Sequence, residues 1–305
     1  MTSPPSGRHV VLGSGDHSAV VVEVGGGLRT YRAGDMDILD GYSDDEMCSS
    51  GRGQPLIPWP NRLAGGRYVF AGTEIRAAVD EPATGAAIHG LTRWRSWEVA
   101  ADGRNRAVAS LRLRPSPGYP FDLHLQITYM LDGGGLSATT VARNDGDRPC
   151  PVALGFHPYL AALGGLVDDL DLCAPGGVRY LADGRGVPTG TVAVDGSEWD
   201  FRDGRRIGER LLDTAFTSLR RDGSGRATVI LADGPAARRV SVWMDSAFTH
   251  LMIFTGDTVF DPARRRRGLA VEPMTAAPDA FNSGDGLRVL EPGQSLEATW
   301  GITPG

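Results

Sequence analysis

The sequence is poor in cysteine: it has three, Cys48, Cys150 and Cys173, which are far apart and form no Cys-x-x-Cys pair. An odd number at this spacing fits neither a disulfide framework nor a zinc site, so we expect small apolar side chains. No apolar stretch comes near the roughly 18 residues of a membrane span. The N-terminus has no basic segment followed by an apolar one. These absences predict a cytoplasmic protein that does not bind a membrane.

Positive charge is not in excess either. The formal net charge is −6 at pH 7, which gives no general attraction to nucleic acid or to anionic lipid. Hydrophobic residues make up 41% of the chain, which is enough for a substantial core. The length of 305 residues is compatible with one domain, because all-β sandwiches and barrels often exceed about 200 residues.

Long helices have little room in a chain with 42 glycines and 20 prolines. Residues 123–131 instead alternate apolar and polar side chains, reach a glycine turn and continue as the β-branched run 136–142, which is typical of a β-hairpin. Residues 18–32 and 227–244 repeat this pattern. Short amphipathic helices are weakly indicated at 206–212 and 159–163. We predict an all-β fold in which residues 1–305 form a single large β-sandwich domain.

His157 and Glu272 each interrupt an apolar segment and are each followed by a proline. Taken alone, the histidine is at least as typical of a core side chain as of a functional site. The glutamate is as typical of a solvent-facing strand residue as of a functional site. A proline ends ladder pairing, however, and strand ends are where functional sites are often built. Together, an imidazole and a carboxylate would supply an acid and a base for proton transfer.

Three further segments supply polar side chains and one aromatic ring. Trp59, Asn61 and Arg62 lie in a proline-flanked segment, His89 precedes a glycine, and Asp213 follows two leucines. Each is weak evidence for a site when taken alone. An arginine or histidine is more often structural or solvated than functional, and the aspartate is as typical of a turn cap as of a binding residue.

In this order, the segments resemble the aldose 1-epimerase (galactose mutarotase) family over about residues 51–301. The residues that carry the resemblance are Pro58-Trp59-Pro60-Asn61-Arg62, Ile88-His89-Gly90-Leu91, Gly155-Phe156-His157-Pro158-Tyr159, Leu212-Asp213-Thr214-Ala215-Phe216 and Val271-Glu272-Pro273-Met274-Thr275. The first and last of these five segments look closer to a bacterial branch of uncharacterised or sulfosugar-associated epimerases than to galactose-pathway enzymes.

The resemblance implies a large β-sandwich with an open sugar cleft, an aldose 1-epimerase activity, His157 as general acid and Glu272 as general base. It implies that Arg62, His89 and Asp213 hydrogen-bond the sugar. We expect Asn61 to add an amide and Trp59 a face for the C–H side of the ring.

Interconversion of anomers removes the proton of the C1 hydroxyl while the ring oxygen is protonated, and reclosure reverses both steps. Reference pKa values of roughly 4.3 and 6.5 predict an ionised glutamate and a partly protonated histidine, and nearby carboxylates would favour the imidazolium. The reaction needs no metal, nucleotide or other cofactor. We expect a monomer or homodimer whose partner is a small-molecule sugar, here a free aldohexose.

Three alternatives remain open. A hexose-phosphate or sulfosugar 1-epimerase would use the run Arg264–Arg267 to hold an anion, whereas otherwise that run is a solvated loop. A non-catalytic carbohydrate-binding protein would keep the polar side chains without needing His157 and Glu272 together. A glycosidase would use two acids such as Asp213 and Glu272, which leaves the histidine segment unexplained.

Overall fold

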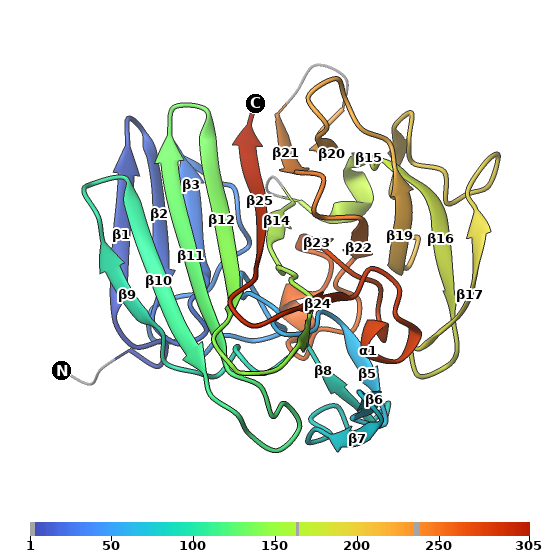
Figure 1. Ribbon diagram of the computed structural model, residues 1–305. Coiled ribbons are helices and arrows are strands. Elements are labelled where there is room, and N and C mark those ends of the chain that lie inside the picture. Colours follow the sequence, from blue (N-terminus) through green and yellow to red (C-terminus); the bar gives the residue numbers. More distant parts are fainter. Residues whose placement is uncertain (1–3, 163–164, 235–237) are drawn as a thin grey trace.

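The computed structural model describes residues 4–162, 165–234 and 238–305. In these ranges the regular structure is β-strand apart from the short helix α1 (Ala280–Ser283) and two single 3₁₀ turns, Val167–Asp169 and Pro262–Arg264 (Figure 1). The all-β prediction is confirmed. The two weakly indicated helices were wrong: Tyr159–Ala161 is a strand, Leu163 lies outside the described residues, and residues 206–212 contain no helical turn.

The largest sheet has nine strands and carries two of the three predicted hairpins. Its strands, in spatial order, are β18 (Arg205–Arg206), β15 (Asp171–Cys173), β20 (Ala227–Ala232), β21 (Arg239–Met244), β25 (Ser295–Pro304), β12 (Gly135–Asn144), β11 (Leu123–Asp132), β10 (Arg106–Leu113) and β9 (Glu98–Ala101). Buried and more exposed residues alternate along β11, as the period of two predicts for a sheet with one covered face.

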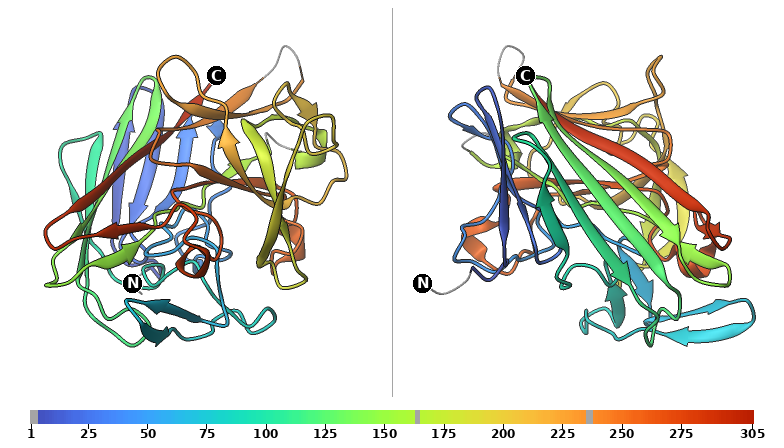
Figure 2. Two further views of the ribbon diagram at one scale, coloured as in Figure 1. Left: turned by 45° about the vertical axis from the view of Figure 1, so that its right-hand side comes forward. Right: turned by 60° about the vertical axis from the view of Figure 1, so that its left-hand side comes forward.

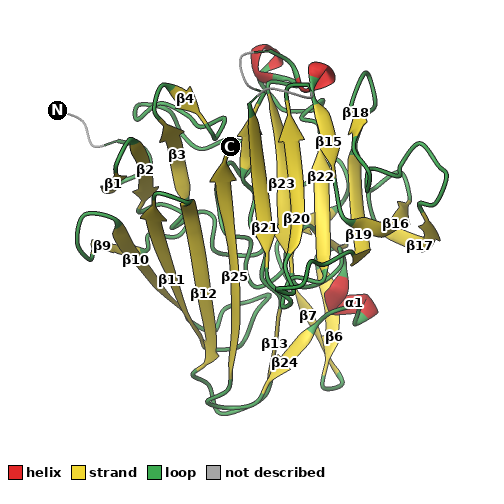
Figure 3. Ribbon diagram, turned by 90° about the horizontal axis from the view of Figure 1, so that it is seen from above, coloured by secondary structure: helices red, strands yellow, loops and turns green. Residues whose placement is uncertain are grey.

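Two further sheets lie against the large one. The four-stranded sheet consists of β1 (His9–Ser14), β2 (His17–Val22), β3 (Leu28–Ala33) and β4 (Met36–Asp37), and it contains the third predicted hairpin. The six-stranded sheet has the order β14 (Tyr159–Ala161), β23 (Gly268–Met274), β22 (His250–Phe254), β19 (Asp213–Leu219), β16 (Gly176–Ala182) and β17 (Pro188–Ala193). Figures 1 and 3 show the first beside β9–β12 and the second beside β20 and β21.

Three two-stranded sheets complete the structure. They pair β5 (Arg62–Ala64) with β8 (Ala86–Ile88), β6 (Arg67–Phe70) with β7 (Thr73–Arg76), and β13 (Cys150–Val152) with β24 (Arg288–Leu290). Figure 2 shows β6 and β7 projecting from the bottom of the molecule. The β5–β8 pair is the important one here, because Arg62 begins β5 and His89 follows β8.

One large hydrophobic cluster runs between the sheets and contains residues from Val10 to Ile302. Cys48 and Cys150 are buried, Cys173 is half-buried, and all three are free thiols, as expected. Among the described residues, no helix has the length and apolar character needed to cross a membrane.

Candidate active site

The register of the six-stranded sheet places two carboxylates on one face. Residues directly opposite each other in antiparallel strands point to the same face, and so do residues two positions apart along a strand. Phe254 is opposite both Asp213 and Ala270, and Met252 is opposite Glu272. Because Glu272 is two residues from Ala270, Asp213 and Glu272 project from the same side of the sheet.

Glu272 and His157 are in contact beside this face. The glutamate Oε1 lies 3.3 Å from the histidine Nε2, and the two residues are only 2% and 4% exposed. The remaining polar atoms, Oε2 of Glu272 and Nδ1 of His157, have no hydrogen-bond partner among the described residues. A buried polar atom without a partner is costly, so these atoms are suited to meet a ligand.

The loop before β5 holds the backbone of His157, and Tyr159 packs against its ring. The backbone N–H of His157 donates to the Gln54 carbonyl at 3.1 Å, and its carbonyl accepts from the Gly53 N–H at 2.9 Å. The imidazole stacks on the Tyr159 ring, with centroids 4.9 Å apart and planes at 11°. A Cβ at Gly51, whose φ is +71°, would lie 3.0 Å from the histidine Cδ2, so a side chain there would press on the ring.

His89 follows β8 and faces His157, with ring centroids 5.2 Å apart in an edge-to-face arrangement. The backbone N–H of Asn61 donates to its Nδ1 at 3.2 Å. That nitrogen therefore carries no proton, and the neutral ring has its proton on Nε2. Burial lowers the pKa of His89 well below its usual range, so the ring offers one N–H donor to the pocket.

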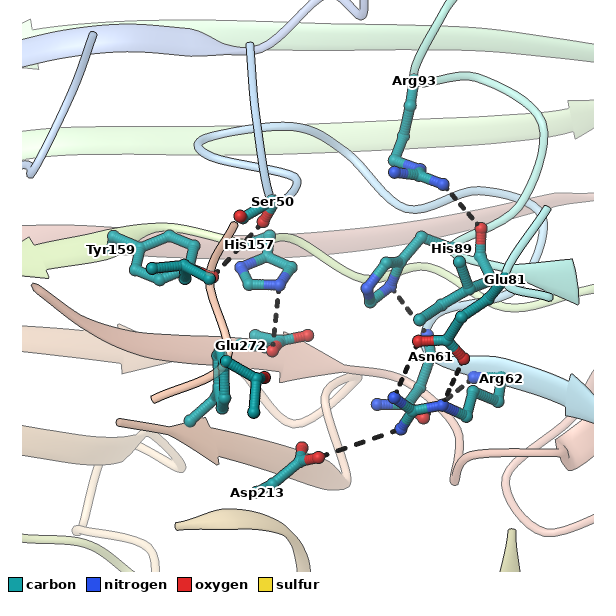
Figure 4. Close-up of a pocket in the computed structure, with 14 residues that line it drawn as sticks. Ser50, Asn61, Arg62, Glu81, His89, Arg93, His157, Tyr159, Asp213 and Glu272 are labelled. Atoms are coloured by element: carbon teal, nitrogen blue, oxygen red, sulfur yellow. Dashed lines mark hydrogen bonds and ion pairs between the residues drawn. The ribbon is translucent and has the colours of Figure 1, made fainter. Parts of the chain in front are cut away.

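Arg62 begins β5 and lies across the pocket from Glu272 (Figure 4). Its Nε and Nη2 donate to the Glu81 carboxylate at 2.6 and 2.9 Å, and its Nη1 is 4.0 Å from the exposed Asp213. Asn61 precedes it with a φ of +56°, and its side-chain oxygen accepts from the Arg62 backbone N–H at 2.8 Å.

The residues around this pair form a pocket of about 230 Å³, which is smaller than the roughly 300–1,000 Å³ of pockets for drug-sized ligands and suits a small molecule. Its lining includes six of the seven predicted site residues. It adds eight more: Ser50, Glu81, Ile88, Arg93, Tyr159, Phe254, Thr258 and Val259. Ser50, Asp213 and Thr258 are exposed, so the pocket is open to solvent.

Glu81 and Arg93 are the charged residues that sequence reasoning missed. Both lie in loops, and their place in the pocket depends on pairing with Arg62 and with Asp80. Tyr159 stood in the histidine segment, so an aromatic two residues from His157 was the one available signal for its stacking role.

Trp59 is the exception among the predicted site residues. It is 3% exposed, belongs to the main hydrophobic cluster and packs edge-on against Phe281 at 5.5 Å between centroids. The expectation that its ring faces a sugar is therefore wrong: the ring packs in the core and does not line the pocket.

The arginine run does not form an anion site at the pocket. Arg264 pairs with Asp40 at 3.0 Å, and Arg266 pairs with Asp168 at 2.8 Å and with Asp257. Arg265 and Arg267 are exposed, and the described pocket lining includes none of the four. Arg264 and Arg266 therefore link neighbouring loops through ion pairs, whereas Arg265 and Arg267 lie on the surface.

The charge states expected from reference values also need correction. Burial lowers the pKa of His157 to about 3, and Arg93 and Arg52 add to this effect. Burial raises the pKa of Glu272 well above its usual range; Asp213 adds to this and Arg62 opposes it. Loss of solvation opposes charge on both members, so burial of the pair favours a neutral imidazole beside a protonated carboxyl, and not the imidazolium.

A β-sandwich with a buried histidine–glutamate pair at a small polar pocket is the arrangement expected of a carbohydrate isomerase of the mutarotase type. The family model described as aldose 1-epimerase matches residues 8–303, and the chain belongs to the aldose 1-epimerase family.

The chain is also similar to individual proteins. The chain is 33% identical to the uncharacterized protein YihR of Escherichia coli K12 over 290 residues, which cover 95% of this chain and 91% of that protein. It is 29% identical to human galactose mutarotase over 165 residues, about half of each chain. A GalM/aldose epimerase homologue from C. elegans has the same fold, with a TM-score of 0.85, 18% identity and 98% of both chains covered.

Proposed function

We propose that this protein interconverts the α and β anomers of a free aldohexose, with His157 and Glu272 as the proton-transfer pair. The observation that carries the proposal is their buried 3.3 Å contact, in which each side chain keeps one polar atom without a partner among the described residues. A positioned acid or base contributes about 10²–10⁴-fold to a proton-transfer rate.

The chemistry requires one labile proton on the pair. Ring opening protonates the ring oxygen and takes the proton of the C1 hydroxyl, so the pair holds the same number of protons afterwards. A neutral imidazole with a protonated carboxyl and an imidazolium with a carboxylate are two arrangements of that single proton. Burial of the pair favours the first.

Sugar binding favours the second arrangement. A hydroxyl that donates to the free Oε2 of Glu272 stabilises the carboxylate, and the proton moves along the existing contact to His157 Nε2. His157 then acts as general acid toward the ring oxygen and Glu272 as general base toward the C1 hydroxyl. In the open-chain aldehyde C1 rotates, and reclosure from either face returns the pair to its starting state.

The remaining polar side chains suit a neutral polyol. His89 offers one N–H donor, Arg62 keeps an N–H group directed at Asp213, and Asp213 is an exposed acceptor. The guanidinium of Arg62 is already balanced by the carboxylates of Glu81 and Asp213, so it provides little net attraction for an anion.

One observation favours a second candidate, an aldose that carries an anionic substituent. Arg93 lines the pocket, pairs with Asp80 through Nη2 alone at 3.1 Å, and has a buried Nε without a partner among the described residues. A sulfonate or phosphate would meet this guanidinium through charge-assisted hydrogen bonds.

The test is anomer exchange measured by NMR for galactose, glucose, glucose 6-phosphate and sulfoquinovose. We expect exchange of the neutral sugars far above the uncatalysed rate, and loss of about 10² or more in His157→Asn. Normal exchange in a folded His157→Asn protein would refute the proton-transfer assignment. A strong preference for an anionic sugar that disappears in Arg93→Met would replace the neutral substrate with the second candidate.

A further inference from the structure

Arg52 lies behind the histidine of the active site, outside the pocket lining. It is 2% exposed, and its guanidinium carbon sits 4.5 Å from the centroid of the Tyr159 ring. His157 stacks on the same ring at 4.9 Å and 11°. A buried cation, an aromatic ring and an imidazole are therefore in successive contact.

The guanidinium is fixed in place by hydrogen bonds. Nε and Nη2 both donate to the Asp40 Oδ2 at 3.2 Å, and Nη1 donates to the Ser49 carbonyl and hydroxyl. The other oxygen of Asp40 accepts from Arg264 Nη2 at 3.0 Å. Glu46 lies 3.6 Å from Nη1 of Arg264, so two carboxylates balance two guanidinium groups in number. The guanidinium of Arg52 is the charged group in contact with the tyrosine ring.

The loop that carries Arg52 also holds the backbone of the histidine. Gly53 and Gln54 form the two backbone hydrogen bonds to His157, and the Tyr159 hydroxyl donates to the Ser50 carbonyl at 3.4 Å. A change in the position of Arg52 would therefore reach the imidazole by two routes, the stacked ring and the loop backbone.

We propose that Arg52 is a positioning residue for His157: it fixes the imidazole plane through Tyr159 and opposes a positive charge on that ring until a sugar is bound. The proposal rests on the proton-transfer role of His157 proposed above. A proton on the imidazole would place a second positive charge against the tyrosine ring that Arg52 already contacts. The cation thus keeps the labile proton on Glu272, where the substrate can release it.

Charged and titratable groups surround His157 on several elements. They are Glu272 of β23, His89 after β8, Tyr159 of β14, and, beyond direct contact, Arg52 and Arg93. At an effective dielectric constant of about 20, a unit charge on the order of 10 Å from the imidazole shifts its pKa by about one unit, and loss of the Arg52 charge should have an effect of this size. The acid limb of the pH–rate profile moves upward when this charge is lost, because the imidazole is then easier to protonate.

The experiment compares Arg52→Met, which removes the charge and keeps the length, with Arg52→Lys, which keeps the charge and loses the planar fork. For Arg52→Met we expect kcat to fall about tenfold or more, KM to change less than about threefold, and the acid limb to rise by about one pH unit. Arg52→Lys should keep the wild-type acid limb with a smaller loss of kcat. Arg267→Met, at an exposed position of the arginine run, is the matched control and should behave as wild type.

A purely structural role would lower the melting temperature of Arg52→Met and leave its acid limb and kcat as in the wild type, and that result overturns the inference. If this variant does not fold, Arg52→Gln keeps an amide donor for Asp40 and is compared in the same way. His157→Asn is measured in parallel. If it is fully active the proposed function itself is wrong, whereas an inactive His157→Asn beside an unaltered Arg52→Met rejects only the role of Arg52.

Discussion

Replacement of Glu272 by glutamine should separate activity from stability. The substitution keeps the shape of a side chain that is 2% exposed and retains a hydrogen-bond acceptor, but an amide cannot take or hold the labile proton. We expect the anomer exchange rate to fall by about 10²–10⁴, which corresponds to about 2.7–5.4 kcal/mol of the barrier. KM should change little.

The same substitution should preserve or raise the melting temperature. The carboxyl is buried, one of its oxygens has no partner among the described residues, and its folded-state pKa is raised. Between its unfolded pKa, about 4.3, and that raised value, the folded state binds more protons at this group than the unfolded state. This group therefore destabilises the protein increasingly as pH rises through that window, and glutamine removes the effect.

The assay is NMR exchange together with thermal unfolding of wild type and Glu272→Gln between pH 5 and pH 8. The stability difference in favour of the variant should grow with pH. Glu297→Gln, the same change at an exposed strand position, serves as control and should alter neither quantity. An exchange rate within tenfold of wild type, or a variant that is less stable at pH 8, would refute the reasoning.

Four further outcomes are expected. The pH–rate profile should be a broad bell, because one proton must stay on the pair. Its acid limb should lie well below pH 6.5, since burial lowers the pKa of His157 to about 3. An acid limb near pH 6.5 would contradict this. Arg62→Met should raise KM in sugar titrations, because it leaves Glu81 and Asp213 without their cation. Trp59→Phe should lower the melting temperature and leave KM unchanged, as expected for a core side chain. Exchange should survive exhaustive EDTA treatment, because both proton transfers are assigned to side chains.

The local patterns of the sequence were sufficient for the strands. Alternation along residues 123–131 and the glycine turn that follows predicted the β11–β12 hairpin, because a period of two and a turn are properties of neighbouring residues. The two short helices were wrong for the opposite reason. Residues 159–161 pair with β23, and this contact, made across more than 100 residues, overrides a weak local periodicity.

Only part of the site could be predicted from the sequence. His157 and Glu272 were named from their segments, and the pairing of β14 with β23 explains how these distant segments meet. Reference pKa values contain no burial, so they do not predict the directions in which burial shifts the pKa values of His157 and Glu272. The prediction for Trp59 was wrong for a related reason. A tryptophan between two prolines gives the same local sequence whether its ring faces a pocket or packs against Phe281 in the core.

The pocket is assembled from segments that are far apart along the chain: Arg62 and His89 lie at the β5–β8 pair, whereas Asp213 and Glu272 lie on β19 and β23. Neither half of the polypeptide can therefore form the site alone. Pairings at long sequence separation form late, because loop-closure entropy must be overcome first. Recovery of catalysis during refolding would consequently report the completion of the whole topology, and it would trail the return of tryptophan fluorescence, which early hydrophobic collapse already alters.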